Sequence, residues 1–103
     1  QLTVEGEPAR QPDAAALSRA VEAVGVSAGY LVLTPPEPLA GCRSMHCTTD
    51  PDGGLAVQVV MEQPGGPAIT RELGGVSRPR AAEILAGFWA GHLPDGLDSW
   101  RSF

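Results

Sequence analysis

Apolar residues recur at helical spacing in two separate stretches of the chain. In the first, residues 14–24, they stand three, four and seven positions apart, at Leu17, Ala20, Val21 and Val24. This spacing places them on one face of an α-helix. Asp13 precedes the stretch as a favourable N-cap, and Gly25 follows it as a C-terminal stop. The pattern therefore predicts a first helix over residues 14–24.

The second helical stretch covers residues 78–91. Four apolar residues form its stripe, which two more widen: Ala81, Ile84, Leu85 and Phe88, then Ala82 and Trp89. Ser77 is placed to cap its first turn, while Gly91 and Pro94 end it. A second helix is therefore expected near the C-terminal end of the chain.

Between the two helical stretches the pattern changes to a period of two. In residues 55–62 apolar side chains alternate with smaller or polar ones, at Leu55, Val57, Val59 and Met61, which is typical of a half-buried strand. The turn-rich segments 50–54 and 63–67 flank this strand. Further strands are predicted at residues 2–5, 29–34, 42–49 and 68–73.

The predicted order is strand, helix, four strands, helix. Consecutive strands joined by tight turns form an antiparallel sheet, and helices at the two ends of the order can pack on one face of it. We therefore predict an α+β fold with a largely antiparallel sheet of about four to five strands and two helices on one face. A chain of 103 residues is long enough for one stable core, so residues 1–103 are expected to form a single domain.

Charge narrows the classes of partner. Twelve Asp and Glu stand against seven Arg and no Lys, for a formal net charge of −5. Direct nucleic-acid binding needs a basic surface, so the excess of acidic residues argues against a nucleic-acid-binding protein. The same excess is compatible with a basic protein partner. No apolar run approaches the roughly 18 residues of a membrane span, and no leader pattern opens the chain. The expected location is cytoplasmic, without membrane contact.

The only metal-like cluster is formed by Cys42, His46 and Cys47. In a regular strand Cys42 and His46 would share one face and Cys47 the other, with the two cysteines about 17 Å apart, so ordinary strand residues are favoured over a metal or redox site. The turn at Asp50 and Asp52 has only the opening of a calcium loop. No hydrolase or phosphate-loop motif is present. The sequence predicts a protein that is not an enzyme and has no cofactor.

The C-terminal residues carry two of the few aromatic side chains. Trp100 and Phe103 follow a Pro-Asp-Gly turn at residues 94–96. Large aromatic residues near a terminus usually attach it to the fold. We expect this segment to fold back so that Leu97 and Trp100 cover a sheet edge or the second helix, in preference to contacting a partner.

Residues 76–103 resemble the C-terminal region of a family of bacterial immunity proteins, the immunity protein one family of polymorphic toxin systems. Its members end with a polar cap, a helix containing small residues and a Phe, a turn, and then a Pro and a Trp. The matching positions here are Ser77, Ala81, Ala82, Phe88, Gly91, Pro94, Leu97 and Trp100. Residues 30–38 look like the family's first long strand and loop, and residues 53–60 like its central hairpin.

The resemblance implies a cytosolic antidote that binds a cognate toxin tightly and blocks its active site. In this family the usual toxin is a nucleic-acid cytidine deaminase, a zinc enzyme that flips a base into its pocket. The resemblance also implies packing roles for Phe88, Pro94, Leu97 and Trp100. An acidic surface can occupy the basic substrate groove of such a toxin.

Four loop carboxylates are the candidate contacts with the toxin: Glu37, Asp50, Asp52 and Glu62. Each could equally be a solvated loop charge. Two other functions remain open from the sequence. One is a small non-catalytic accessory or scaffold domain of a larger assembly, and the other is a metal-binding protein built on the Cys/His cluster.

Overall fold

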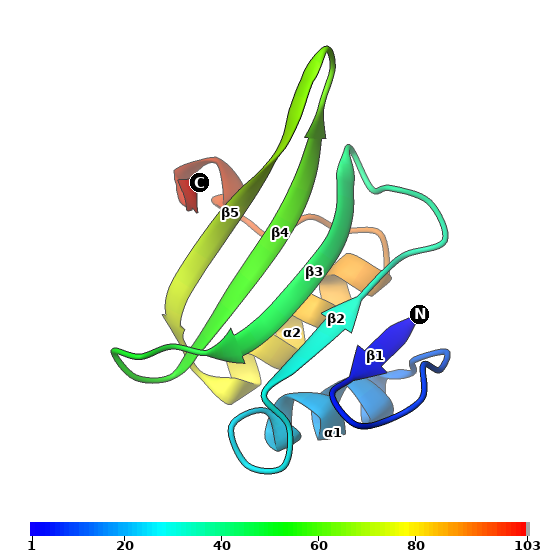
Figure 1. Ribbon diagram of the computed structural model, residues 1–103, viewed down its shortest axis with the longest axis vertical. Helices are drawn as coiled ribbons and strands as arrows, with labels where there is room; N and C mark the ends of the chain where they lie inside the picture. Colours follow the sequence, from blue (N-terminus) through cyan, green and yellow to red (C-terminus); the bar gives the residue numbers. More distant parts are fainter. Residues whose placement is uncertain (103) are drawn as a thin grey trace.

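The computed structural model describes residues 1–102, which form one six-stranded antiparallel sheet and two α-helices. The strands lie side by side in chain order, and both helices cover the same face of the sheet (Figure 1). The α+β prediction is confirmed, with slightly more strands than the four to five expected. The elements are β1 Leu2–Val4, α1 Ala14–Ala23, β2 Tyr30–Leu33, β3 Cys42–Thr49, β4 Leu55–Gln63, β5 Gly66–Val76, α2 Arg78–Trp89, a 3-10 turn Leu97–Ser99 and β6 Arg101–Ser102.

The strand absent from the prediction is β6. It has two residues, which pair with Arg71 and Glu72 of β5, and two residues are too few to show any periodicity in a sequence. The guanidinium of Arg71 also donates to the backbone oxygen of Asp98 at 3.2 Å. The C-terminal segment thus folds back along β5, as expected for Leu97 and Trp100, while Phe103 lies outside the described residues.

Helix α1 begins where its cap was predicted. The Asp13 carboxylate accepts a hydrogen bond from the Ala16 N–H at 2.7 Å, which satisfies one of the free N–H groups of the first turn. Leu17 and Val21 are buried against the sheet side of the molecule. The helix ends at Ala23, and Gly25 follows with φ of +82°, a conformation that glycine adopts readily.

Helix α2 is fixed at both ends. Ser77 accepts from the Arg80 N–H at 3.3 Å, and the last turn closes with two bonds, from His92 N–H to the Gly87 oxygen at 2.8 Å and from Gly91 N–H to the Phe88 oxygen at 3.1 Å. With Gly91 at φ of +96°, this is a Schellman ending. Helix α2 therefore stops abruptly and the chain turns back toward the sheet.

The core fills the space between the sheet and the two helices. Its central residues on β3 and β4 are Met45, Cys47, Val57 and Val59, all with no exposed surface. Leu85 and Phe88 of α2 are buried with them in the same cluster. Because strand side chains alternate, burial of this set leaves the opposite face of both strands free of the helices.

Arg78 joins the two helices. Its Nη1 donates to the backbone oxygens of Val21 at 2.7 Å and Glu22 at 3.3 Å, carbonyl groups in the last turn of α1 that have few other partners. A guanidinium placed there also favours the negative end of the helix dipole. Arg78 is half-buried, and its shorter bond, to Val21, is partly shielded from water.

Replacement of this link should destabilise the fold. We expect R78A to lower the free energy of unfolding by about 1–3 kcal/mol, because it removes two charge-assisted hydrogen bonds between the helices and leaves the Val21 oxygen with only the Val24 N–H at 3.3 Å. The matched control is R80A, two residues away, where the guanidinium makes only an exposed pair with Glu83 at 3.4 Å and the expected loss is under about 0.5 kcal/mol. Urea unfolding at pH 7 measures both; equal losses would contradict the role given to Arg78.

Candidate functional site

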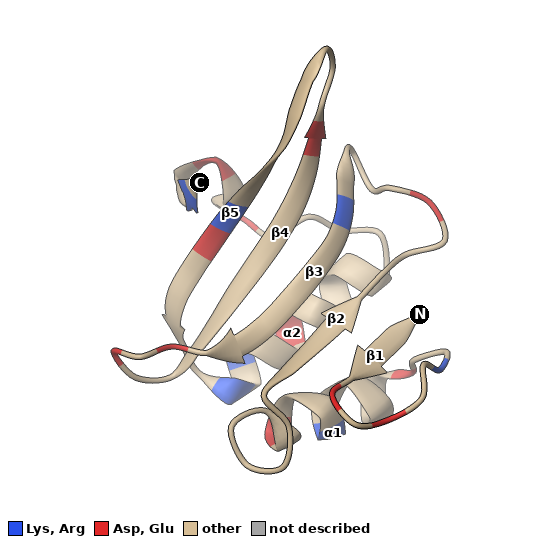
Figure 2. Ribbon diagram, in the orientation of Figure 1, with Lys and Arg blue, Asp and Glu red and all other residues tan. Residues whose placement is uncertain are grey.

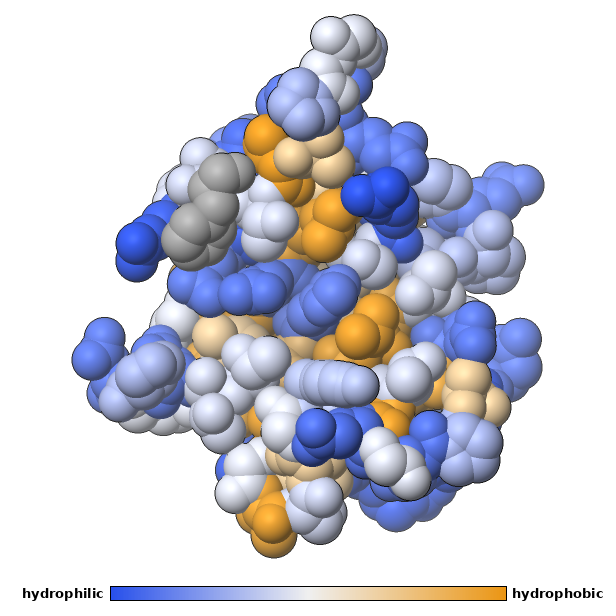
Figure 3. All heavy atoms as spheres, viewed as in Figure 1, coloured by the Kyte–Doolittle hydropathy of each residue, from blue (hydrophilic) through white to orange (hydrophobic). Residues whose placement is uncertain are grey.

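Neither helix covers the face of the sheet turned away from them, and we call it the open face (Figure 1). One row of directly paired residues crosses it from β2 to β6: Val32, His46, Gln58, Glu72 and Arg101. Most of this face is hydrophilic or intermediate, with hydrophobic residues in separate patches (Figure 3). It is a mixed surface of the kind that an antiparallel sheet presents to water.

Two side-chain hydrogen bonds order the centre of the open face. Gln58 donates from Nε2 to Glu72 Oε1 at 2.8 Å, and Ser44 Oγ lies 3.1 Å from His46 Nε2. Burial lowers the pKa of His46, so its ring is neutral at pH 7. The one carboxylate in this row, Glu72, is bonded to Gln58. These contacts make a pre-ordered hydrogen-bonding surface rather than an aligned Ser-His-acid triad.

The four predicted contact carboxylates lie in two places. Asp50 and Asp52 belong to the turn between β3 and β4, whereas Glu62 lies at the far end of β4 and Glu37 in the loop after β2. The length of β4 separates these two places by about 25 Å. Figure 2 shows acidic residues at both ends of the sheet. The fold thus does not bring the four together.

Asp50 has a structural task. Its Oδ1 accepts the Asp52 N–H at 2.9 Å and its Oδ2 accepts the Gly75 N–H at 2.7 Å. The carboxylate therefore closes its own turn and ties it to the end of β5. Among the described residues no side-chain partner bonds the carboxylates of Asp52, Glu37 or Glu62, and all three are exposed.

Glu62 and Glu37 lie at the same end of the sheet. The Glu62 N–H donates to the Gly41 oxygen at 2.8 Å, which holds the end of the loop that carries Glu37 against β4. We call this end, defined by Glu37 and Glu62, the acidic end. Among residues 1–102, two of the predicted contact residues with unbonded carboxylates lie at this end of the sheet.

A hollow of about 370 Å³ lies beside the acidic end, and we call it the proline hollow. It is lined by loop residues 35–39, which include Pro35, Pro36, Glu37 and Pro38, and on the other side by Phe88, Trp89 and Gly91 of the α2 end. Trp89 is half-buried and lines the hollow. Sequence reasoning placed Trp89 in the helix stripe and did not predict this hollow.

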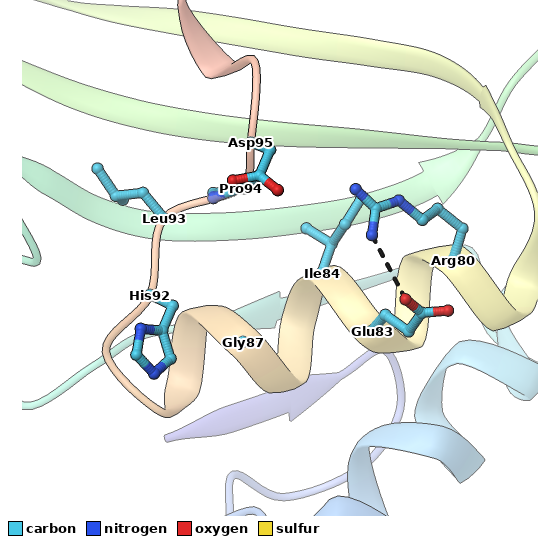
Figure 4. A pocket seen from close by; sticks show the side chains of 8 residues that line it. All are labelled: Arg80, Glu83, Ile84, Gly87, His92, Leu93, Pro94 and Asp95. Carbon is cyan, nitrogen blue, oxygen red and sulfur yellow. Dashed lines mark hydrogen bonds and ion pairs between the residues drawn. The ribbon is translucent and has the colours of Figure 1, made fainter.

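A second hollow, of about 210 Å³, runs along α2 and the residues that follow it (Figure 4). Arg80 and Glu83 pair across one turn of the helix, while His92 lies at the opposite end of the group and Asp95 on the returning chain. The titratable side chains thus do not converge on one point. Within residues 1–102 no three His, Cys, Asp or Glu side chains form a group that could hold a metal ion.

The Cys/His cluster is arranged differently from the sequence prediction. Cys42 was expected to share a face with His46, but a register shift between Cys42 and Ser44 turns Cys42 into the core with Cys47. His46 lies on the open face. Both thiols are fully buried, and burial raises the pKa of each, that of Cys47 to about 11 despite the nearby Arg78 cation. The two cysteines therefore lie on the core side of the sheet and His46 on the other side, so the three side chains do not form one cluster.

The residues with expected packing roles lie at the C-terminal side of the core. Phe88, Leu97 and Trp100 are buried, with at most 7% of their surface exposed, and Pro94 is half-buried at the second hollow. Trp100 thus belongs to the core of the isolated chain. The chain after the 3-10 turn folds back along the β5 edge through Arg101 and Ser102.

No protein-family model, curated protein or solved structure matches this chain significantly. None of the helices in the described part of the chain has both the length and the apolar character that crossing a lipid bilayer requires.

Histidine on the open face gives the fold a pH dependence. Because native His46 has a pKa below the usual value of about 6.5, the unfolded state binds more protons as pH falls through that value, and stability decreases. We expect urea midpoints of the wild type to fall between pH 7 and pH 5 by more than those of H46Q, which keeps a hydrogen-bonding group near Ser44. H92Q, which changes an exposed histidine, should retain the wild-type trend. Parallel curves for the wild type and H46Q would contradict this assignment.

Proposed function

We propose that this chain is an immunity protein: it binds a cognate bacterial toxin and neutralises it by covering its active site or its basic substrate groove. The observation that carries the proposal is the acidic end, where the carboxylates of Glu37 and Glu62 have no bonding partner among the described residues, in a chain of net charge −5. Other carboxylates do have internal tasks: Glu5 accepts the Gly29 N–H, Asp13 caps α1, and Asp50 ties its turn to β5.

The resemblance of residues 76–103 to the immunity protein one family supports the same proposal. Within the described residues this stretch includes α2 and the segment that folds back along β5, so the matching residues lie in one part of the fold. We propose that this segment stabilises the fold and does not itself contact the toxin. The surfaces left for a partner are then the acidic end, the proline hollow and the open face.

The toxin proposed is a nucleic-acid cytidine deaminase. An enzyme that grips a phosphate backbone presents a cationic groove, and the acidic end offers the opposite charge. Opposite charges speed the encounter, while apolar anchors such as those of the proline hollow slow dissociation. In this role the chain acts in the cytoplasm, catalyses nothing, needs no cofactor, and contacts neither nucleic acid nor membrane.

The first test is direct capture followed by inhibition. The tagged chain should retain a toxin domain from a lysate of its source strain at a one-to-one ratio, and the purified toxin should lose its deaminase activity when the chain is added in equimolar amount. Capture of a protein whose activity is unchanged by the chain would support an accessory or scaffold role and contradict the proposal.

Charge should control the rate of toxin binding. We expect E37Q/E62Q to slow association by about two- to tenfold at low salt, with a weaker dependence of the rate on ionic strength than the wild type. The matched control, E22Q/D52N, also removes two exposed carboxylates, one on α1 and one at the other end of the sheet. Stopped-flow measurement gives the rates. An E22Q/D52N rate as low as that of E37Q/E62Q would assign the effect to total charge and refute the acidic end as the contact.

A further inference from the structure

The walls of the proline hollow are suited to a flat side chain with an apolar stem. Three prolines of loop residues 35–39 face the end of α2, where Phe88 is 1% exposed and Trp89 is half-buried. An indole face attracts cations more strongly than the other aromatic rings do. Water is displaced from such apolar walls at little cost, since they offer it few hydrogen bonds.

The charge of the proline hollow has one sign. Glu37 is the only charged residue that lines it, and its carboxylate is exposed and unbonded among the described residues. The α2 helix ends at this place with no basic residue in its last turn, so no cationic side chain of that turn offsets the partial negative charge of the helix end. The hollow is thus an apolar slot with a negative rim.

The loop that carries Glu37 is held in shape from both sides. At its start the Thr34 N–H donates to the Gln1 oxygen at 2.8 Å, and at its end Leu39 and Cys42 exchange two backbone bonds of 2.9 and 2.8 Å. Proline rings fix φ for three of the residues between. A slot held in this way loses little conformational freedom when it is filled.

We propose that the proline hollow receives an arginine side chain of the toxin. The guanidinium plane lies on the Trp89 indole and bonds the Glu37 carboxylate, and the methylene stem lies between the prolines. Arginine is favoured over lysine because its planar group both stacks and forms a forked bond to a carboxylate. This inference rests on the proposed function for the identity of the partner. A second copy of the chain is disfavoured as the occupant, since two chains of charge −5 repel each other.

The binding step can be tested without the toxin. The probe is the capped tripeptide acetyl-Gly-Arg-Gly-amide, followed by NMR through the two indole N–H signals of the protein. The Trp89 signal should shift in a saturable way. The signal of Trp100, which is buried beneath the β5 edge, should stay in place and serves as the internal reference. The same peptide with neutral citrulline, which has nearly the shape of arginine, should bind about tenfold more weakly.

Variants separate this site from general charge attraction. E37Q should weaken peptide binding about fivefold, whereas D52N, which removes an equal charge at the far end of the sheet, should leave it within about twofold. W89L keeps an apolar residue in the α2 stripe and should also weaken binding. Because this variant lacks the Trp89 reporter, its binding is followed through the arginine side-chain signals of the peptide, and its fold is checked by the unchanged Trp100 signal.

Three results would overturn the inference: equal binding of the arginine and citrulline peptides, an equal loss in D52N and E37Q, or a chain dimer in sedimentation that E37Q abolishes. The last would assign the hollow to a second copy. Peptide binding that persists when no toxin is captured would leave the arginine site standing and count against the immunity function alone.

Discussion

Burial of one face of β3 and β4 beneath the two helices is the constraint on which the remaining structure depends. Met45, Cys47, Val57 and Val59 lose all their exposed surface there, and each large apolar side chain so buried contributes about 1.5–3 kcal/mol. No other layer covers the sheet in the described residues (Figure 1). The face beneath the helices thus provides most of the buried apolar surface, and polar residues on the other face and in the loops do not disturb this core.

The parts of the fold that sequence could predict are those that repeat. Helix α2 has an apolar stripe, a cap at Ser77 and a stop at Gly91, and β4 alternates over most of its length, so both were predicted close to their observed bounds. Single irregularities could not be predicted. The register shift beside Cys42 reverses the side on which that residue lies, and strand periodicity contains no signal for such a shift.

The candidate site shows the same division. The sequence could indicate that Glu37, Asp50 and Glu62 lie in or beside loops. It could not indicate which of these carboxylates forms hydrogen bonds within the fold. Asp50 bonds Gly75, 25 residues away, and this partner follows from how the turn meets β5. The proline hollow likewise joins loop residues 35–39 to Trp89, two segments whose meeting depends on the order of strands in the sheet and on where α2 ends.

The two buried thiols have a consequence for where the fold can exist. Cys42 and Cys47 are both free, fully enclosed in the core, and protonated at neutral pH because burial raises the pKa of each. Oxidants act on exposed thiolates, so these side chains are protected while the chain is folded. Stability comes from packing, without a covalent cross-link. The folded chain therefore exposes neither thiol to its surroundings, and no disulfide contributes to the surface that it presents.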